Sequence, residues 1–215
     1  MHFLTLFLLS CFSLSVLASG ISIGGTRFVY VDNKREITIP ILNSNKEKPF
    51  LIQSWVTGFE NETKAPFIAT PPLFRVEPDS HGTARIAYMG MPLSSNEEKL
   101  YLLNIKSIPP KRDDIENELQ IIINSQFKLF LRSKDIQPLN FDDVNIIRKK
   151  NRLWIKNNTP YHLSIKSVFI DSHIIQTSKM VYPWEEKQIS NKNIGTEQSV
   201  TVEFINDYGA IIEKN

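Results

Sequence analysis

Short apolar runs alternate with turn residues along most of the chain, and the runs are rich in Ile, Val, Tyr, Phe and Trp. No long segment repeats its apolar residues about every 3.6 positions, so the pattern predicts β-strands rather than helices. A first group of runs comprises TRFVYV (26–31), REITIPILN (35–43), PFLIQSWV (49–56), ARIAYMG (84–90), KLYLLNIKSI (99–108) and LQIIINSQFKLFL (119–131). A second group comprises RLWIKNN (152–158), YHLSIKSVFI (161–170), QSVTVEFIND (198–207) and GAIIEKN (209–215).

The number and spacing of these runs fit immunoglobulin-like sandwiches, since such a domain has about seven strands in roughly 100 residues. Between the two groups, RSKDIQPLNFDD (132–143) is polar and contains Pro138, which favours a domain junction. We therefore expect an all-β protein with a first immunoglobulin-like domain at 19–131, a linker at 132–138 and a second immunoglobulin-like domain at 139–215.

The first residues, MHFLTLFLLSCFSLSVLASG, form an apolar run that ends in small residues, which is the layout of a secretory signal peptide. Serines interrupt the run, so a signal peptide of residues 1–18, cleaved near Ala18, fits better than a retained membrane anchor of about 20 apolar residues. Cys11, the only cysteine, lies inside this segment, and the residues before it fit a lipid-anchor signal poorly. The mature chain then has no cysteine and needs no disulfide in an oxidising compartment.

Composition narrows the class of function. With 41% hydrophobic and 22% charged residues the chain should fold, and its net charge of +2 predicts no general attraction to nucleic acid or anionic lipid. The histidines His2, His81, His162 and His173 have no metal-ligand spacing and are expected as surface or turn residues. The sequence has no GxSxG elbow and no glycine-rich phosphate loop, so we expect no enzyme, no metal site and no cofactor.

Several local segments are more specific than this β pattern. They are TRFVY (26–30), IATPPLFRVEP (68–78), LYLLNIKSIPPK (100–111), QFKLFLR (126–132), NNTPYHLSI (157–165) and INDYGA (205–210). In this order they resemble the signature segments of the PapD-like family, the periplasmic chaperones that assemble pili by the chaperone–usher route. The resemblance implies two immunoglobulin-like domains set at an angle with a cleft between them. It also implies a chaperone that lends a strand to a pilus subunit, caps its exposed groove and delivers it to an outer-membrane usher, with no small-molecule substrate.

The resemblance further implies an anchor for the subunit's C-terminal carboxylate, formed by Arg27 and Lys128. Two cations can both donate charge-assisted hydrogen bonds to such a carboxylate. Because Lys128 lies five residues after Ile123, strict alternation would place it on the opposite face from the strand lent to the subunit. We expect a bulge, or a turn towards the cleft, to supply the difference.

The strand lent to the subunit, the donor strand, is assigned to Leu119, Ile121 and Ile123, which alternation places on one face. Ile122 then points to the other face and to the chaperone's own core. Adding a strand to an exposed sheet edge is a known mode of peptide recognition, of which chaperone–pilin complexes are established examples. Taken by its periodicity alone, the apolar run also fits a strand that is buried inside the sandwich.

Other positions are implied to be structural. Arg75, Glu98 and Asp207 match the family's buried charge network between the two domains, where buried charges must be paired. Thr70–Pro71 matches a turn with a cis proline, which X-Pro bonds permit. Pro49 falls where the family places a proline beside the subunit-binding pocket.

The sequence departs from the family pattern in two places and leaves one alternative function open. The short link at 112–118 resembles the branch of the family that builds rod-like pili, and the chain ends soon after INDYGA, without the final strand and cysteine pair of some members. An exposed apolar edge predicts self-dimerisation of the unbound chaperone. The alternative function is a secreted adhesin or carbohydrate-binding sandwich, for which the tryptophans, Trp55, Trp154 and Trp184, are widely spread.

Overall fold

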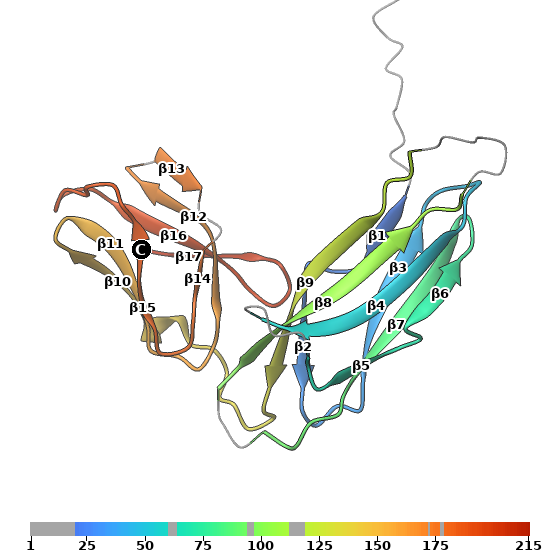
Figure 1. Ribbon diagram of the computed structural model, residues 1–215. Helices are drawn as coiled ribbons and strands as arrows, with labels where there is room; N and C mark the ends of the chain where they lie inside the picture. The colour runs from blue at the N-terminus through green and yellow to red at the C-terminus, as the bar shows by residue number, and fades with distance from the viewer. Residues whose placement is uncertain (1–19, 60–63, 94–96, 112–118, 172, 177–178) are drawn as a thin grey trace, which may run out of the picture.

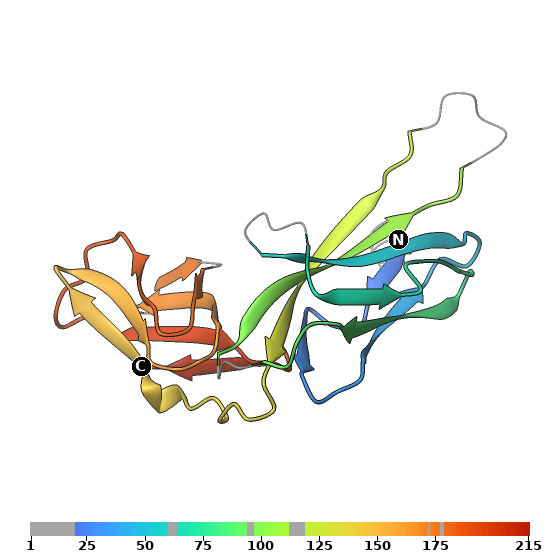
Figure 2. The ribbon, with the colours of Figure 1, turned by 60° about the horizontal axis from the view of Figure 1, so that its bottom comes forward.

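The computed structural model describes residues 20–59, 64–93, 97–111, 119–171, 173–176 and 179–215, and the expected signal peptide lies outside them. These residues form two β-sandwiches set at an angle, joined by a segment that contains the short 3-10 turn η1 (Phe141–Asp143) (Figures 1 and 2). The prediction of an all-β chain with two sandwich domains is confirmed. Within the described residues, no helix is long and apolar enough to cross a membrane.

The first sandwich packs two sheets face to face. One sheet has the order β1 (Ile21–Ile23), β3 (Ile37–Asn43), β7 (Ser80–Tyr88) and β5 (Phe67–Thr70). The other has the order β2 (Arg27–Val31), β9 (Ile123–Arg132), β8 (Lys99–Ile108), β4 (Phe50–Gly58) and β6 (Leu73–Val76). Alternate residues of the two sheets fill the core, as expected for strands with one buried face: Ile39, Ile41, Ile52, Leu103, Ile105, Leu129 and Leu131.

The second sandwich has its own apolar core. One sheet has the order β10 (Val144–Lys149), β11 (Arg152–Asn157) and β15 (Glu186–Ser190). The other has the order β13 (His173–Gln176), β12 (Leu163–Ile170), β16 (Val200–Ile205) and β17 (Ile211–Lys214), and β14 (Met180–Val181) also pairs with β12. The core includes Val144, Leu153, Ile155, Val168, Val202 and Phe204. Since each sandwich buries a separate cluster, the contacts between them must come from other residues.

Strand β9 has two neighbours of unequal length. It pairs antiparallel with β8 from Ile123 to Leu131, whereas β2 pairs with it, in parallel, only at Lys128–Arg132. In the described part of the chain, the segment Ile123–Phe127 therefore has a strand on one side only. The segments on either side of residues 112–118 extend beyond the sheets at this end of the sandwich (Figure 2). β9 ends at Arg132, a residue that the sequence analysis assigned to the linker.

The register of β9 corrects two expectations. Ile123 lies opposite Ser107 and Lys128 opposite Leu102 without any shift, so the bulge expected between the donor residues and Lys128 is absent. Each residue of β8 takes one residue of β9, and alternation therefore places Lys128 on the face opposite Ile123. Ile122 does not enter the sandwich core as expected but is 45% exposed, because it precedes the first paired residue of β9.

Candidate functional site

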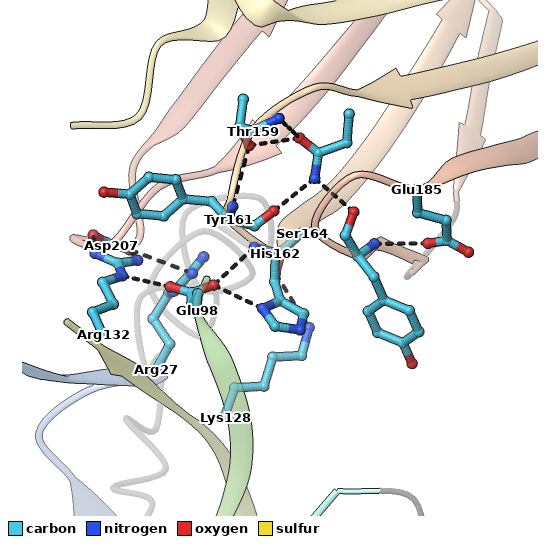
Figure 3. A network of polar contacts seen from close by, with 12 residues as sticks. Arg27, Glu98, Lys128, Arg132, Thr159, Tyr161, His162, Ser164, Glu185 and Asp207 are labelled. Carbon is cyan, nitrogen blue, oxygen red and sulfur yellow. Dashed lines mark hydrogen bonds and ion pairs between the residues drawn. The ribbon is translucent and has the colours of Figure 1, made fainter. Parts of the chain in front are cut away.

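Two cations face the space between the domains from neighbouring strands. Arg27, the first residue of β2, is the parallel partner of Lys128 in β9. The Arg27 side chain is only 7% exposed, its Cζ atom lies 4.4 Å from the centre of the Phe130 ring, and its Nη1 donates to the Ile205 carbonyl at 2.8 Å. Its Nη2 lies 3.4 Å from Oδ1 of Asp207. The sequence-predicted pair is thus brought together at the domain boundary (Figure 3).

This cation pair, Arg27 and Lys128, is incompletely compensated. The Nε atom of Arg27 is buried and has no hydrogen-bond partner, and Lys128 Nζ donates to the hydroxyl of Ser164 at 3.3 Å. No carboxylate in the described part of the chain forms an ion pair with Lys128. Burial lowers the pKa of the Lys128 amine, and the positive charge of Arg27 lowers it further. A site of this kind attracts an anion that can accept from both side chains.

A third cation, Arg132, joins the domains through two carboxylates. Its Nε lies 2.5 Å from Oε1 of Glu98, a first-domain residue whose side chain has no exposed surface. Its Nη1 and Nη2 donate to the two oxygens of Asp207, in the second domain, at 2.5 and 2.8 Å. The guanidinium also lies over the Tyr161 ring, 4.8 Å from its centre. This bidentate pairing fixes the direction of approach of the second domain.

The pKa values around Arg132 follow from this geometry. Burial alone would lower the pKa of Arg132, but the hydrogen bond to Asp207 and the charges of Glu98 and Asp207 outweigh burial and raise it. Burial alone would likewise raise the pKa of Asp207, but the hydrogen bond and charge of Arg132, with the charge of Arg27, lower it. The arginines and Asp207 therefore remain charged at neutral pH.

The turn between β16 and β17 aims Asp207 at Arg132. Asn206 accepts hydrogen bonds from the backbone N–H groups of Tyr208 and Ala210 at 3.0 and 2.9 Å, and Gly209 takes a φ of 79°. Asn is common in such turns because its side chain bonds to the following backbone, and Gly tolerates positive φ. The turn between β16 and β17 thus explains why the INDYGA segment contains Asn206 and Gly209.

Glu98 also reaches the second domain through His162. Its Oε2 accepts from the backbone N–H of His162 at 2.8 Å and lies 2.9 Å from Nδ1 of the same residue. The backbone N–H of Glu98 donates to the Pro160 carbonyl at 2.9 Å. Glu98 is therefore bound to the second domain through both its backbone and its side chain.

Asn157 shapes the segment that presents Pro160 and His162. Its Nδ2 donates to the carbonyls of Tyr161 and Tyr182, both at 2.7 Å. Its Oδ1 accepts from the backbone N–H and the hydroxyl of Thr159, at 3.0 and 2.6 Å. Since Asn157 is only 1% exposed, these hydrogen bonds of its side chain support the turn from inside the domain.

The expectation that Arg75 belongs to the buried charge network between the domains is wrong. Arg132 occupies that position in the network. Arg75 lies on β6, the outermost strand of its sheet, where it is 62% exposed and forms an ion pair with Glu77 at 2.8 Å. It cannot reach the second domain because β4, β8 and β9 lie between β6 and β2. The signal for Arg132 was its position four residues after Lys128, which gives both side chains the same face of β9.

His162 was also misjudged, because it was expected at the surface or in a turn. Its side chain is 8% exposed and lies between the rings of Phe130 and Tyr182. The signal available was its place in the NNTPYHLSI segment, although burial at a domain boundary cannot be read from one strand's pattern.

The other predicted positions lie in the first domain. Leu119, Ile121 and Ile123 are 87%, 68% and 58% exposed, which excludes the alternative of a buried strand for this part of the run. The Thr70–Pro71 peptide bond is cis. Pro49 lines a surface pocket of about 250 Å³ at the β4 and β8 ends, far along the sheet from the cation pair.

Comparison with known proteins agrees with this geometry. The model of the family described as pili and flagellar-assembly chaperone, PapD N-terminal domain, matches residues 20–137, and that described as pili assembly chaperone PapD, C-terminal domain, matches residues 141–215. The "probable fimbrial chaperone protein ElfD" of Escherichia coli strain K12 is 34% identical over 212 residues, covering 96% of this chain and 91% of ElfD. Chaperone protein FocC of Escherichia coli is 30% identical over 203 residues, covering 91% and 88%.

Solved structures give the same assignment. The CupB2 chaperone of Pseudomonas aeruginosa superimposes with a TM-score of 0.77 at 29% identity, over 90% of this chain and 97% of that one. A chain from the complex of the Salmonella enterica SafA pilin with the SafB chaperone superimposes with a TM-score of 0.77 at 26% identity, over 91% and 94%. The chain therefore belongs to the PapD family of pilus assembly chaperones.

Proposed function

We propose that this protein binds a pilus subunit by donor-strand complementation, caps the subunit's exposed groove in the periplasm and delivers it to an outer-membrane usher. The observation that carries the proposal is the segment Ile123–Phe127 of β9, which has a neighbouring strand on one side only. This segment leads to the cation pair Arg27 and Lys128, whose positive charge is only partly compensated. Fimbrial chaperones among the relatives, and the pilin complex of SafB, support the same reading.

The strand geometry sets the direction of the bound segment. Strand β2 begins at Arg27, opposite Lys128, so an added strand beside Ile123–Phe127 would end where β2 begins. If its C-terminal carboxylate lies at the cation pair, the added strand runs parallel to β9, as β2 does. Main-chain hydrogen bonds along the edge then supply affinity, and the carboxylate fixes the register.

The cation pair suits a carboxylate better than a neutral group. Two buried cations that already repel each other gain a shared counter-charge, and the unpartnered Nε of Arg27 can be satisfied at the same time. The subunit carboxylate would raise the pKa of Lys128 back towards its ordinary value, because an opposite charge favours the protonated amine.

The apolar donor row supplies the remaining contact. Leu119, Ile121 and Ile123 are exposed in the unbound protein, so a subunit groove that covers them would remove much of their apolar surface from water. Burial of each such side chain contributes about 1.5 to 3 kcal/mol before the costs of ordering are subtracted. The same exposed edge would let two unbound copies dimerise.

In this proposal the first domain, which ends with β9 at Arg132, holds the subunit, and the second domain, residues 139–215, closes the cleft. Export requires the expected signal peptide at 1–18.

The proposal is tested by co-expression with a fimbrial subunit in the periplasm, purification of the chaperone and identification of the bound protein by mass. We expect wild type and Arg75→Ala to carry the subunit, whereas Arg27→Ala and Lys128→Ala lose it. Equal recovery with all four proteins would refute the anchor, and recovery with none would favour the secreted adhesin.

A further inference from the structure

One carboxylate, Glu98, divides its two oxygens between the two domains. Oε1 accepts from Arg132 Nε, in its own domain, at 2.5 Å. Oε2 faces two nitrogens of His162, in the second domain: the backbone N at 2.8 Å and the ring Nδ1 at 2.9 Å. The side chains of Glu98 and His162 are 0% and 8% exposed, so water contributes little to either group.

The distance between His162 Nδ1 and Glu98 Oε2 shows that Nδ1 carries a proton. Glu98 forms an ion pair with Arg132, and an ionised carboxylate only accepts hydrogen bonds. A lone pair on Nδ1 would face a lone pair on Oε2 at 2.9 Å, which is repulsive. The Nδ1 atom must therefore carry a proton and donate it to Glu98.

Neighbouring rings keep the imidazole in this orientation. The ring centre of His162 lies 5.8 Å from that of Phe130, a first-domain residue, and 5.5 Å from that of Tyr182, a second-domain residue. The Tyr182 contact is edge-to-face, with an interplanar angle of 77°. The donor is thus held in place by packing from both domains.

We propose that His162 is a positioning residue whose ring, with a proton on Nδ1, holds Glu98 to the second domain and orients the carboxylate that pairs with Arg132. Its effect on subunit capture rests on the proposed function, whereas the proton on Nδ1 and the orientation of Glu98 do not.

Two variants separate the hydrogen bond from the packing. His162→Phe keeps an aromatic ring between Phe130 and Tyr182 but removes the donor. His162→Asn removes the ring but places an amide N–H close to the position of Nδ1. A structural role of the ring alone predicts that Phe is the better replacement, and a positioning role predicts that Asn is.

The first measurement is nitrogen NMR of the imidazole in the unbound wild-type protein. We expect Nδ1 to be protonated, with a coupling across the hydrogen bond to Glu98. An Nε2–H tautomer would overturn the proposal, and this measurement needs no variant to fold.

The second measurement is the urea unfolding midpoint of the two variants. Because His162→Phe leaves the buried Glu98 without its ring donor, it should unfold at a lower urea concentration than His162→Asn, which restores a donor. A His162→Phe protein at least as stable as His162→Asn would overturn the proposal. If wild type captures no subunit, the proposed function fails, while the imidazole spectrum and the unfolding midpoints still decide the role of His162.

Discussion

Replacement of Arg132 by Met tests the domain contact most sharply, because a matched replacement exists in the same chain. Arg132→Met keeps most of the apolar stem but removes the guanidinium from Glu98 and Asp207. Arg75→Met makes the same chemical change at an exposed pair with Glu77.

The expected magnitudes differ because burial differs. Removal of one partner from a buried ion pair costs about 3 to 5 kcal/mol, and Glu98 has no exposed side-chain surface. His162 still donates to Glu98, and Asp207 is 37% exposed and can be hydrated, so we expect the lower end, about 3 kcal/mol. Arg75→Met should cost about 0 to 1 kcal/mol, as is usual for surface pairs.

The assay is urea unfolding, since guanidinium would screen the charges. Tryptophan fluorescence follows both domains, because Trp55 lies in β4 of the first domain and Trp154 in β11 of the second. Equal losses of stability in Arg132→Met and Arg75→Met, or a loss below about 1 kcal/mol in Arg132→Met, would refute the reasoning that burial makes the Arg132 network dominant.

Further predictions concern the donor strand and pH. Ile121→Asp should leave the unfolding transition unchanged and abolish subunit capture, whereas Ile52→Asp, in the core, should unfold the first domain. If both substitutions unfold the first domain, Ile121 is a core residue and the donor assignment is wrong. Because the pKa of Asp207 is lowered in the folded protein, its contribution to the domain contact is complete above the unfolded-state pKa of about 3.9 and is lost as pH falls through the folded-state pKa. Small-angle scattering should therefore show the domains separating in acid. Asp207→Asn should remove that transition. Subunit affinity should fall as pH rises through the lowered pKa of Lys128, since the neutral amine no longer attracts a carboxylate; an affinity that stays constant into the alkaline range would contradict the anchor.

Strands such as β3 and β4 were predictable because their residues alternate between a buried face and a more exposed face. Strand β12, which is buried at most positions, was predictable from its apolar run. Arg27 and Lys128 were found through family segments, and their proximity depends on the parallel pairing of β2 with β9. The error at Arg75 has a different origin: its strand lies at the outer edge of the sheet, and sheet order is not encoded in the residues near Arg75. For His162, burial arises only when the second domain docks, which the local sequence pattern does not report.

The wrong expectation for Ile122 shows that the faces of a strand cannot be assigned without its register. The apolar run suggested that one face belongs to the core, but the core-facing positions of β9 are those of Leu129 and Leu131, an even number of residues from Ile123. A shift of one residue reverses the assignment of every side chain in such a strand. Sequence alone located the run but could not assign its faces.

Amide hydrogen exchange along Ile123–Phe127 tests the central claim most directly. In the unbound protein, the amides on the side away from β8 should exchange fast, and capture of a fimbrial subunit should slow them while leaving the outer strand β6 unchanged. Fast exchange of these amides in a stable complex would show that the subunit binds elsewhere and would contradict donor-strand complementation by β9.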